Sequence, residues 1–495
     1  MRLADLLADF WPAACLDAAA AGCEITGLSA DSRKIGAGNA FFALPGSKAD
    51  GLSFAPDAIA RGAGAIIAER KPEPALAGVV FVELADARRA LALAAARFFG
   101  SQPESIVAVT GTSGKTSVTV FVRQIWQALG HRAASLGTIG LVAPSAVANA
   151  ALTTPDPVSL HETLAALAAD GVTHLALEAS SHGLDQRRLD GLHLKAAAFT
   201  NLSRDHLDYH ADLNAYLAAK MRLFEVLLEP GQPAVIDADS EVAGQVEALC
   251  RARGLEILTV GRQGRALRLL DMRPQALASE LLLEHAGRRL SLRLPLAGAF
   301  QVQNALVAAG LALASGAAPE AVFAALEKLE GVPGRLELVG RHKEAPIFVD
   351  YAHKPDALEK VLETLRPLTT ARLIIVFGCG GDRDKGKRPI MGAVAARLAD
   401  VVIVTDDNPR SEEASAIRRA ILDGMSGIAA GASHVALYEI GDRGAAIAQA
   451  VSMLAPGDVL LIAGKGHETG QIIGDKVVSF SDQQSVRSAL RDFAA

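Results

Sequence analysis

The sequence predicts a multidomain α/β protein with two mainly parallel sheets, and three observations support this fold class. The chain has 495 residues, which is too long for one hydrophobic core and fits about three domains of roughly 150 residues each. After residue 104, short apolar runs such as SIVAVT, THLALEAS, AAAFTNL and PAVIDAD alternate with helical stretches. Near the C-terminus, IFVDYAH, ARLIIVFGCG, ADVVIVTDD and DVLLIAGKG repeat this alternation, and each run ends in polar or glycine-rich residues. Such alternation is typical of βαβ units.

The composition indicates a globular protein and argues against two kinds of partner. Half of the residues are hydrophobic and the net charge is −6, whereas a general nucleic-acid binder needs a basic surface. Asp5, Asp9 and Asp17 interrupt the apolar N-terminal stretch, and no apolar run approaches the ~18 residues that span a bilayer. None of the four cysteines belongs to a C-x-x-C pair, as expected for reduced thiols. These features predict a cytoplasmic protein.

Two segments rich in glycine and proline divide the chain. They are Gly100-Ser101-Gln102-Pro103 and Gly331-Val332-Pro333-Gly334, and both residue types interrupt regular structure. The expected domains are therefore residues 1–101, 102–334 and 335–495. In the last of these, residues 411–425 (SEEASAIRRAILDGM) predict a helix with Ser411 as its N-cap.

The segment 105–126 (SIVAVTGTSGKTSVTVFVRQIW) predicts a strand, a glycine loop and a helix. In such a loop glycines let backbone amides face an anion, a lysine reaches the β- and γ-phosphates, and a threonine ligates Mg²⁺. The first glycine of the full Walker A pattern is absent, because Val109 occupies its position. A solvated turn is the alternative, but the flanking strand and helix favour binding of ATP or GTP. The expected nucleotide-binding residues are Gly111, Thr112, Ser113, Gly114, Lys115, Thr116 and Ser117.

Two further strands of the central region end in residues suited to a hard cation. Glu178 follows one strand, and residues 202–210 (LSRDHLDYH), which follow the next, contain two aspartates and two histidines. A surface glutamate and a polar helix cap are the alternatives. Beside a nucleotide loop we prefer Mg²⁺ and phosphate chemistry, since Mg²⁺ favours oxygen ligands. Lys220, among apolar neighbours, suits a surface lysine when it is considered alone.

Taken together, these motifs resemble the Mur ligases. Eleven segments occur in that family's order: GTSGKTS, LTTPD, EASSHGL, NLSRDHLDYH, YLAAKMRLF, GAFQVQN, GVPGRLE, VDYAHKPDAL, VFGCGGDRDKGKRP, TDDNPR and AGKGHE. With DSR at 31–33, the resemblance extends over nearly the whole chain. It implies an N-terminal domain for the UDP end of a substrate and a central P-loop ATPase domain with a parallel sheet. It also implies a Rossmann-like C-terminal α/β domain that closes over ATP and binds an incoming amino acid.

The resemblance further implies an ATP-dependent amide ligase of peptidoglycan precursor synthesis. Its expected substrates are UDP-N-acetylmuramoyl-L-alanyl-D-glutamate and meso-2,6-diaminopimelate, and it is expected to act as a monomer. Phosphorylation of the free carboxylate gives an acyl phosphate, which the amine attacks to give the amide, ADP and phosphate. Because an anionic carboxylate must approach the γ-phosphate, cations are needed to offset the repulsion.

Catalytic and metal-binding roles follow from the same resemblance. Thr116, Glu178 and His206 are expected to hold Mg²⁺. Lys220 resembles the family's carbamylated lysine, whose CO₂-derived carbamate would bind a second Mg²⁺. The expected catalytic residues are Lys115, Glu178, His206, Lys220 and His353.

Other residues are assigned by resemblance to the nucleotide and to the UDP-linked substrate. Asn304, Arg335 and Asp350 are expected at the nucleotide, with Asp350 on the ribose. Taken singly, they suit a helix cap, a linker charge and a strand-end turn. The expected contacts of the UDP-linked substrate are Ala30, Ser32, Ser47, Lys48, Ala49, Thr153, Thr154, Ser180, Gln186 and Arg188.

The amino acid is expected to bind at strand ends of the C-terminal domain. The loop 378–389 (GCGGDRDKGKRP) departs from a dinucleotide fingerprint, since its sixth residue is Arg383, and arginine can bind a carboxylate bidentately. L-Lysine lacks the far carboxylate of diaminopimelate and would leave Arg410 unpaired, typically at a cost on the order of 2–5 kcal/mol. The expected contacts of diaminopimelate are Arg383, Asp407, Asn408, Pro409, Arg410, Gly464 and Glu468.

Several other functions are weaker interpretations. L-Lysine could replace diaminopimelate in the same reaction. A ligase that adds D-alanyl-D-alanine and a folylpolyglutamate synthase are disfavoured by the combination of DNPR with GDRDKGKRP. A catalytically silent structural subunit would be expected to have lost Lys115, Glu178, His206 or Lys220, and all four are present. A P-loop motor or switch GTPase does not account for the second sheet.

Overall fold

The computed structural model describes residues 1–10, 18–46, 49–74, 76–148, 152–207, 209–275, 277–426 and 435–493. The chain divides into two compact units. Unit 1 comprises Met1–Arg268 and Val307–Ala325, and unit 2 comprises Leu269–Leu306 and Leu326–Ala495. Within the described ranges, no helix is both long enough and apolar enough to cross a membrane.

A four-stranded parallel sheet forms the N-terminal part of unit 1. In sheet order, its strands are β1 (Gly27–Ser29), β2 (Asn39–Ala43), β3 (Ala65–Ala68) and β4 (Val80–Glu83). Its helices are α1 (Leu3–Leu6), α2 (Ala18–Ala21), α3 (Ala55–Ala60) and α4 (Ala87–Phe99). Buried side chains of β2 and β3 divide between two cores, one shared with α3 and the other with α1 and α4. Both faces of the sheet are therefore covered, and the buried residues of its inner strands are apolar.

A larger sheet forms the rest of unit 1 and carries the glycine loop. In sheet order, its strands are β12 (Glu256–Gly261), β11 (Pro233–Asp237), β10 (Leu194–Phe199), β5 (Ser105–Thr110), β9 (His174–Glu178), β6 (Ala133–Gly137), β7 (Gly140–Val142) and β8 (Val147–Ala148). Neighbours from β12 to β6 are parallel, and β7 and β8 are antiparallel additions. The carboxyl ends of β5, β9 and β10 consequently meet at one edge, where ligands of open α/β sheets bind.

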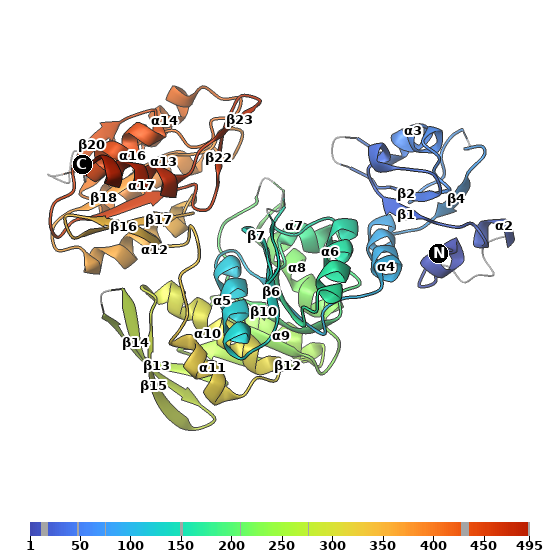
Figure 1. The fold of residues 1–495 in the computed structure, drawn as a ribbon, viewed down its shortest axis with the longest axis horizontal. Coiled ribbons are helices and arrows are strands. Elements are labelled where there is room, and N and C mark those ends of the chain that lie inside the picture. The colour runs from blue at the N-terminus through green and yellow to red at the C-terminus, as the bar shows by residue number, and fades with distance from the viewer. Residues whose placement is uncertain are drawn as a thin grey trace. The chain divides into compact units, whose positions relative to one another are not determined.

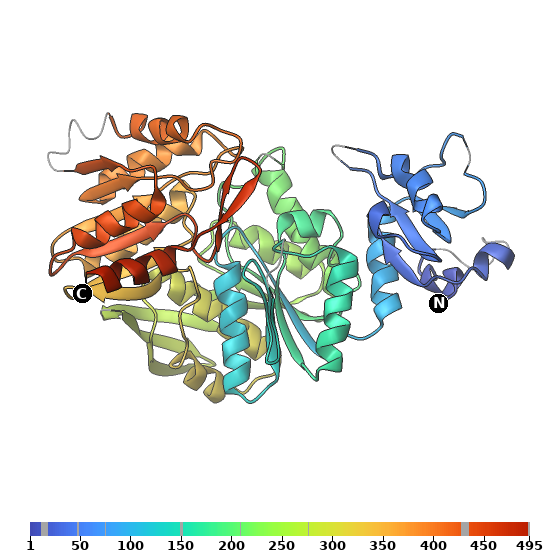
Figure 2. The same cartoon turned by 45° about the horizontal axis from the view of Figure 1, so that its top comes forward.

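Helices cover the faces of this central sheet. They are α5 (Lys115–Ala128), α6 (Pro157–Ala169), α7 (Ser181–Asp185), α8 (Leu213–Arg222) and α9 (Ala243–Ala252). Helix α5, cyan in Figures 1 and 2, packs against β5, β9 and β6. Its residues Val118, Phe121, Val122 and Ile125 are buried. The strand, glycine loop and helix predicted for residues 105–126 are confirmed.

Five elements contain or approach the division between the units. Strand β13 (Leu267–Gln275) pairs with β12 and leads to the antiparallel strands β14 (Ala278–His285) and β15 (Arg288–Leu294). Helices α10 (Ala299–Ala314) and α11 (Pro319–Leu326) follow them in the chain.

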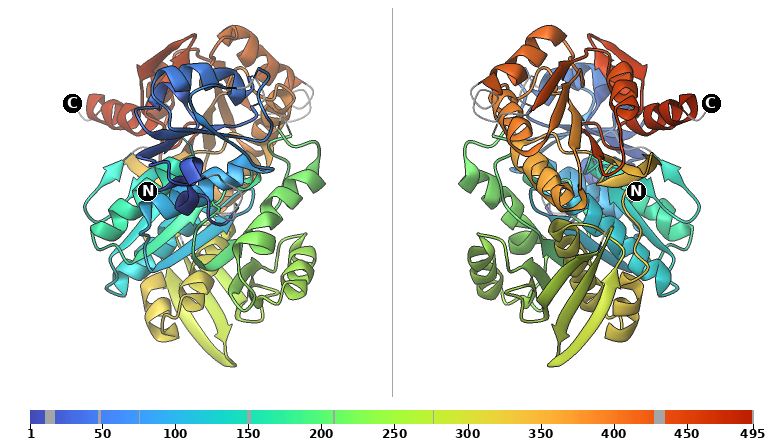
Figure 3. Two further views of the ribbon diagram at one scale, coloured as in Figure 1. Left: turned by 90° about the vertical axis from the view of Figure 1, so that its right-hand side faces the viewer. Right: turned by 90° about the vertical axis from the view of Figure 1, so that its left-hand side faces the viewer.

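Unit 2 contains a six-stranded sheet that is parallel except for one edge strand. In sheet order, the strands are β16 (Glu337–His342), β17 (Ala345–Asp350), β21 (Val459–Ala463), β18 (Leu373–Phe377), β19 (Val401–Val404) and β20 (Ala436–Glu439). Its helices are α12 (Pro355–Leu365), α13 (Lys387–Leu398), α14 (Ala414–Asp423), α16 (Arg443–Ser452) and α17 (Asp482–Asp492). One core contains residues of α12, α13 and α14, and the other contains residues of α16 and α17. The right-hand view of Figure 3 shows these orange and red helices on opposite sides of the sheet.

The predicted start of one helix in unit 2 is wrong. Helix α14 begins at Ala414, and its N-cap is Glu413, whose side chain accepts a hydrogen bond from Ser415 N. Ser411 instead binds the Asp382 carboxylate through its amide (3.1 Å) and its hydroxyl (2.7 Å). Ser411 therefore contacts a loop distant in the sequence and does not cap α14.

Candidate active site

The phosphate loop lies between β5 and α5 and requires its glycines. Gly111 has φ 142° and Gly114 has φ 87°, values that L side chains rarely adopt. A Cβ on Gly111 would lie 1.9 Å from Thr200 Oγ1. Lys115 Nζ donates to the carbonyl oxygens of Gly111 (2.9 Å) and Thr112 (3.0 Å). The arrangement places a lysine and a helix N-terminus together, as a polyphosphate site requires.

Glu178 ends β9 and is held by the turn that follows β6. Its side chain is 1% exposed, so the interpretation as a surface glutamate is wrong. Thr138 donates to it twice, from N to Oε1 (2.7 Å) and from Oγ1 to Oε2 (3.1 Å). A Cβ on Gly137 would lie 2.1 Å from Glu178 Oε1. Sequence reasoning missed Thr138, although it belongs to a Gly-Thr-Ile-Gly turn directly after an apolar strand.

Lys220 lies at the phosphate loop. It is 1% exposed, so the interpretation as a surface lysine is wrong. Its Nζ donates to Gly111 O at 2.8 Å and lies 4.1 Å from the centre of the Tyr216 ring. Lys115 and Lys220 thus bind the same carbonyl oxygen. Burial raises the pKa of Tyr216 above its ordinary value.

His206 lies on the loop that follows β10. It has φ 52°, and its Nε2 is 3.1 Å from Asp205 Oδ2. Its ring centre is 6.1 Å from that of Tyr216, so it borders the residue that covers Lys220. In the described ranges, no three His, Cys, Asp or Glu side chains are grouped so that they could hold a metal. The predicted Mg²⁺ ligands include two residues of these types, Glu178 and His206, and the others are a threonine and a lysine.

Four residues expected at the UDP-linked substrate join one hydrogen-bonded group that starts from Glu178. Thr154 Oγ1 donates to the Glu178 carbonyl (2.8 Å) and lies 3.0 Å from Ser180 Oγ. Arg188 donates to the Thr154 carbonyl (2.7 Å) and to Gln186 Oε1 (2.7 Å). Burial lowers the pKa of Arg188.

Two neighbours extend this group at its ends. Thr153 Oγ1 is 3.1 Å from Thr138 Oγ1. Gln186 Nε2 donates to the Tyr209 hydroxyl (3.3 Å), which itself donates to Asp185 (2.6 Å). The structure therefore connects the predicted substrate residues of the central sheet to the carboxylate predicted to bind the metal.

The N-terminal sheet carries the other expected contacts of the UDP-linked substrate. Ala30 is exposed and Ser32 is buried in a short 3₁₀ helix just after β1, while Ala49 is exposed on the segment after β2. Arg33 binds the carboxylate of Asp31 and lowers its pKa to about 2. The predictions for Ser47 and Lys48 lie outside the described residues.

In unit 2, the residues expected at the nucleotide surround the end of β17. Asp350 is buried and accepts hydrogen bonds from the amides of Leu336 (2.6 Å) and Ala352 (2.7 Å). Burial raises its pKa, against the opposing effect of Arg335. The Arg335 guanidinium lies 4.5 Å from the centre of the Tyr351 ring.

Asn304 and His353 are positioned by neighbouring groups. Asn304 is buried within α10 and donates to Gln301 (3.2 Å), so its interpretation as a helix cap is wrong. Gln301 in turn donates to the Arg335 carbonyl at 3.4 Å. His353 Nδ1 is 2.8 Å from Tyr351 O, and Lys387 Nζ donates to His353 O at 2.8 Å. Burial lowers the pKa of Lys387.

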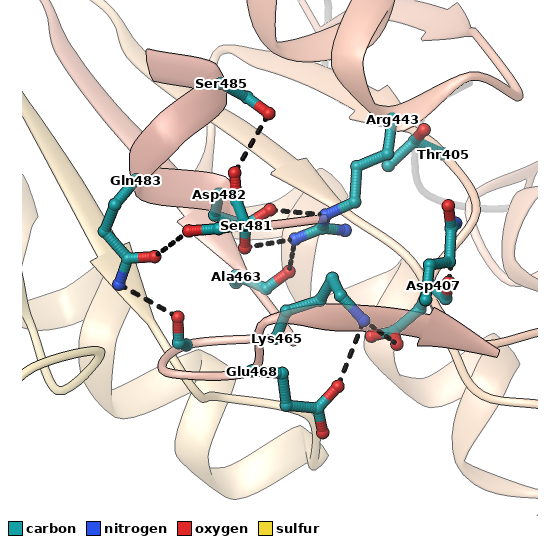
Figure 4. Close-up of polar contacts among 12 residues, drawn as sticks. Thr405, Asp407, Arg443, Ala463, Lys465, Glu468, Ser481, Asp482, Gln483 and Ser485 are labelled. Atoms are coloured by element: carbon teal, nitrogen blue, oxygen red, sulfur yellow. Dashed lines mark hydrogen bonds and ion pairs between the residues drawn. The ribbon is translucent and has the colours of Figure 1, made fainter. Parts of the chain in front are cut away.

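The loops after β19 and β21 meet at a buried lysine that sequence reasoning missed (Figure 4). Lys465 is fully buried and donates to Asn408 Oδ1 (3.0 Å) and Glu468 Oε2 (3.0 Å). Asn408 Nδ2 donates to the same Glu468 oxygen at 2.9 Å. Asp407 lies 3.8 Å from Lys465, and burial raises its pKa. A Cβ on Gly464 would lie 2.7 Å from Asp407 Oδ2, so these loops approach closely.

The two arginines expected to bind the amino acid lie beside Gly380. A Cβ on this glycine would lie 2.9 Å from Arg410 Nη1 and 3.8 Å from Arg383 Cγ. Arg410 has φ 53° and donates from Nη1 to Gly381 O at 2.8 Å. Pro409 is buried, and its carbonyl would lie 1.9 Å from a Cβ on Gly381. The structure thus brings the GDRD and DNPR loops together.

Three family models match successive parts of the chain. The model described as "Mur ligase family, catalytic domain" matches residues 24–99, "Mur ligase middle domain" matches 109–312, and "Mur ligase, glutamate ligase domain" matches 334–466. They correspond to the N-terminal sheet, to the central sheet with its glycine loop, and to the sheet of unit 2.

The chain is also similar to proteins named UDP-N-acetylmuramoyl-L-alanyl-D-glutamate–2,6-diaminopimelate ligase. The one from Bradyrhizobium diazoefficiens is 55% identical over 494 residues, which is 99% of each chain. The one from Zymomonas mobilis is 45% identical and is matched over 94% of this chain and 95% of its own. A solved structure titled with that ligase name is 35% identical, with a TM-score of 0.71 over 97% of both chains. A crystal structure of MurF from Acinetobacter baumannii shares the fold at 20% identity, 89% and 90% coverage and a TM-score of 0.61.

Proposed function

Because the chain belongs to the Mur ligase family, we propose that it joins meso-2,6-diaminopimelate to UDP-N-acetylmuramoyl-L-alanyl-D-glutamate at the expense of ATP. The observation that carries the proposal is the identity of 55% over nearly the full length of a relative bearing that ligase name. The strand-end residues give independent support, because they supply a phosphate loop, a buried carboxylate and a mixed-charge site for an amino acid.

In the proposed reaction, the first step is phosphoryl transfer from ATP. An oxygen of the D-glutamate carboxylate that is to be extended attacks the γ-phosphorus of ATP. The bond between this phosphorus and the β-phosphate oxygen breaks, which gives an acyl phosphate and releases ADP. The phosphate loop and Lys115 bind the triphosphate, while Arg188, Gln186, Thr154 and Ser180 bind and orient the UDP-linked substrate. Lys115 offsets the charge that develops on the transferred phosphoryl group.

We assign Thr116, Glu178 and His206 as ligands of Mg²⁺. The residues fit this cation, because a hydroxyl and a carboxylate are oxygen ligands and Thr138 fixes the orientation of Glu178. Bound Mg²⁺ would neutralise phosphate charge as the carboxylate approaches.

We further propose that Lys220 carries a carbamate in the active enzyme. Two ammonium groups on one carbonyl oxygen repel each other, and a carbamate would reverse the charge of one and provide oxygens for a second Mg²⁺. Lys220→Ala is expected to lose activity, and formate or acetate should restore part of it by supplying a carboxylate in the vacated space. Absence of rescue over a range of both acids would contradict the carbamate.

In the second step, the amine nitrogen of diaminopimelate attacks the acyl carbon, loses a proton, and expels phosphate. We assign the far carboxylate of diaminopimelate to Arg383 and Arg410 and the neighbouring ammonium to Glu468 and the Gly464 carbonyl. Asp407, Asn408 and Pro409 shape the loop, and Asn304, Arg335, Asp350 and His353 belong to the nucleotide. L-Lysine would leave the arginines without a carboxylate.

The decisive experiment supplies ATP, Mg²⁺ and UDP-N-acetylmuramoyl-L-alanyl-D-glutamate and measures phosphate release with meso-diaminopimelate or L-lysine. Release that depends on diaminopimelate, with a product heavier by one residue in mass spectrometry, is expected. Comparable release with L-lysine would contradict the assigned specificity, and no release with either amino acid would contradict the function.

We also propose that the domains comprise residues 1–101, 102–334 and 335–495 and bind, in this order, the UDP moiety, ATP and the amino acid. The enzyme is proposed to act as a cytoplasmic monomer. Analytical ultracentrifugation of the purified chain tests the monomer, and a concentration-dependent dimer would contradict it.

A further inference from the structure

We propose that Lys465 is a positioning residue for the amino-acid site, whose ammonium orients Asn408 and Glu468 for a bound diamino acid without touching it. This inference rests on the proposed function and deepens it. Figure 4 shows the lysine between the two loops, with its side chain directed toward Glu468 and Asp407.

The hydrogen bonds of Lys465 determine which way the Asn408 amide faces. An ammonium group only donates, so the atom 3.0 Å from Lys465 Nζ must be the acceptor, Oδ1 of Asn408. Ile472 N donates to the same oxygen at 2.9 Å. The amide nitrogen consequently faces Glu468 and donates to its Oε2 at 2.9 Å. Without Lys465, the orientation of Asn408 would depend on the Ile472 amide and on Glu468, whose own position Lys465 also helps to fix.

Lys465 also fixes the carboxylate that is proposed to bind the ammonium of the substrate. Lys465 and Asn408 both donate to Oε2 of Glu468. Because the carboxylate is planar and rigid, fixing Oε2 restricts the positions that Oε1 can take. Glu468 is 31% exposed, whereas Lys465 is fully buried. The glutamate can therefore reach a ligand, and the lysine acts from behind it.

The backbone that carries Lys465 is itself anchored on both sides. Arg443 donates to the Ala463 carbonyl at 2.9 Å and forms a fully buried ion pair with Asp482 at 2.7 Å. On the other side, Gln483 donates to the Gly466 carbonyl at 3.0 Å. An exposed lysine side chain can adopt many conformations in solvent. Lys465 is buried on an anchored backbone, so its charge stays at a fixed place in the loop.

Lys465 limits the mutual repulsion of the carboxylates that surround it. Asp407, Glu468 and Asp482 face the two cations Lys465 and Arg443, which leaves an excess of one carboxylate for an incoming ammonium. Removal of the lysine charge would increase the mutual repulsion of Asp407 and Glu468, and the pKa of Asp407 is already raised by burial. Protonation or displacement of either carboxylate would weaken recognition of the ammonium.

The test compares Lys465→Met, which keeps the volume without the charge, with the control Lys343→Met, which removes a lysine charge at an exposed position. Lys343 donates to a backbone carbonyl, that of Leu454 at 3.1 Å, and belongs to none of the proposed sites. For Lys465→Met we expect the KM for diaminopimelate to rise at least tenfold, while kcat and the KM values for ATP and the UDP-linked substrate change less than threefold. Lys465→Gln, which can donate to one partner, should give an intermediate KM.

A double-mutant cycle with Glu468→Gln separates positioning from a general loss of structure. If Lys465 acts through Glu468, the KM of the double variant should match that of Glu468→Gln alone, and multiplicative effects would overturn the proposal. An unchanged KM for diaminopimelate, or an equal rise in all three KM values, would also overturn it. Loss of a cooperative unfolding transition in both Lys465 variants would assign the lysine to folding instead.

The protein without substitutions is assayed first, so that failure of the proposed function can be distinguished from failure of the role proposed for Lys465. Absence of diaminopimelate-dependent phosphate release there contradicts the proposed function and, with it, this inference. Normal release there, together with an unaffected Lys465→Met variant, contradicts only the role of Lys465.

Discussion

At the scale of single residues, the candidate site consists of polar groups that neighbours hold in place. Glu178 receives two hydrogen bonds from Thr138, and Asp350 receives two from backbone amides. Asn408 is bound at its oxygen by Lys465 and Ile472. Such support keeps a site near its productive geometry before a ligand binds.

Thr138 offers a direct test of this support. Thr138→Val keeps the shape of the side chain and removes the hydroxyl that donates to Glu178 Oε2. We expect roughly a 10- to 100-fold loss of activity or of Mg²⁺ affinity, as is usual for residues that orient a metal ligand. Activity measured against Mg²⁺ concentration checks this. Thr163→Val is the control, because its hydroxyl donates to the Ser159 carbonyl within α6; an equal loss there would contradict the prediction.

Replacement of Arg410 should weaken binding of the amino acid without weakening binding of ATP. Its guanidinium lies beside Gly380 and binds the Gly381 carbonyl. Arg410→Ala removes the cation proposed to bind the far carboxylate, so the KM for diaminopimelate should rise at least about tenfold. Steady-state kinetics in which each substrate is varied in turn should find the KM for ATP unchanged. An unchanged KM for diaminopimelate would assign another role to this arginine.

At the scale of elements, two helices of unit 2 are joined at their first residues. Arg443 begins α16 and Asp482 begins α17, and their ion pair is fully buried at 2.7 Å. The same guanidinium binds the end of β21 at Ala463. One arginine therefore fixes two helices and the strand that leads into the Lys465 loop.

Asp482→Ala should destabilise this part of the protein strongly. The variant leaves a buried guanidinium without its carboxylate, which typically costs about 3–5 kcal/mol. The denaturant midpoint of the transition that reports on unit 2 measures the effect. Asp271→Ala is the control, because its ion pair with Arg273 is exposed on both sides (48% and 78%) and should contribute at most about 1 kcal/mol. Equal midpoints for the two variants would show that the buried pair does not stabilise unit 2.

The elements show what local sequence can and cannot predict. Residues 105–126 were predictable because strand, glycine loop and helix each have a local signal. Burial of Lys220 was not, since it depends on α8 packing against a loop 109 residues earlier in the chain. Glu178, which binds Thr138, and Asn408, which binds Lys465, are likewise 40 and 57 residues away from these partners. The start of α14 was mispredicted because a tertiary contact occupies Ser411.

At the scale of the whole molecule, both large sheets place their chemistry at the carboxyl ends of parallel strands. Unit 1 carries the phosphate loop after β5, and unit 2 carries the Asn408 and Lys465 loops after β19 and β21. The opposite ends of the strands are available for structural contacts. Trp126 and two histidines, His131 and His174, form such a contact where β9 begins.

This histidine contact predicts how the stability of the folded protein depends on pH. The rings of His174 and His131 are stacked at 4.0 Å. Burial, and to a smaller extent the charge of His131, lowers the pKa of His174 from 6.5 to about 4. The unfolded chain therefore takes up this proton first. The stability that the neutral ring contributes is fully present above pH 6.5 and is lost as the pH falls towards 4.

His174→Gln should remove this part of the pH dependence. The thermal midpoint of the unmodified protein should fall more steeply than that of the variant between about pH 6.5 and pH 4.5, because only the unmodified chain gains a proton at this site on unfolding. His131→Gln should give an intermediate slope, since it removes the like charge but leaves His174 buried. Parallel midpoint curves for all three proteins would mean that His174 keeps its ordinary pKa in the folded state.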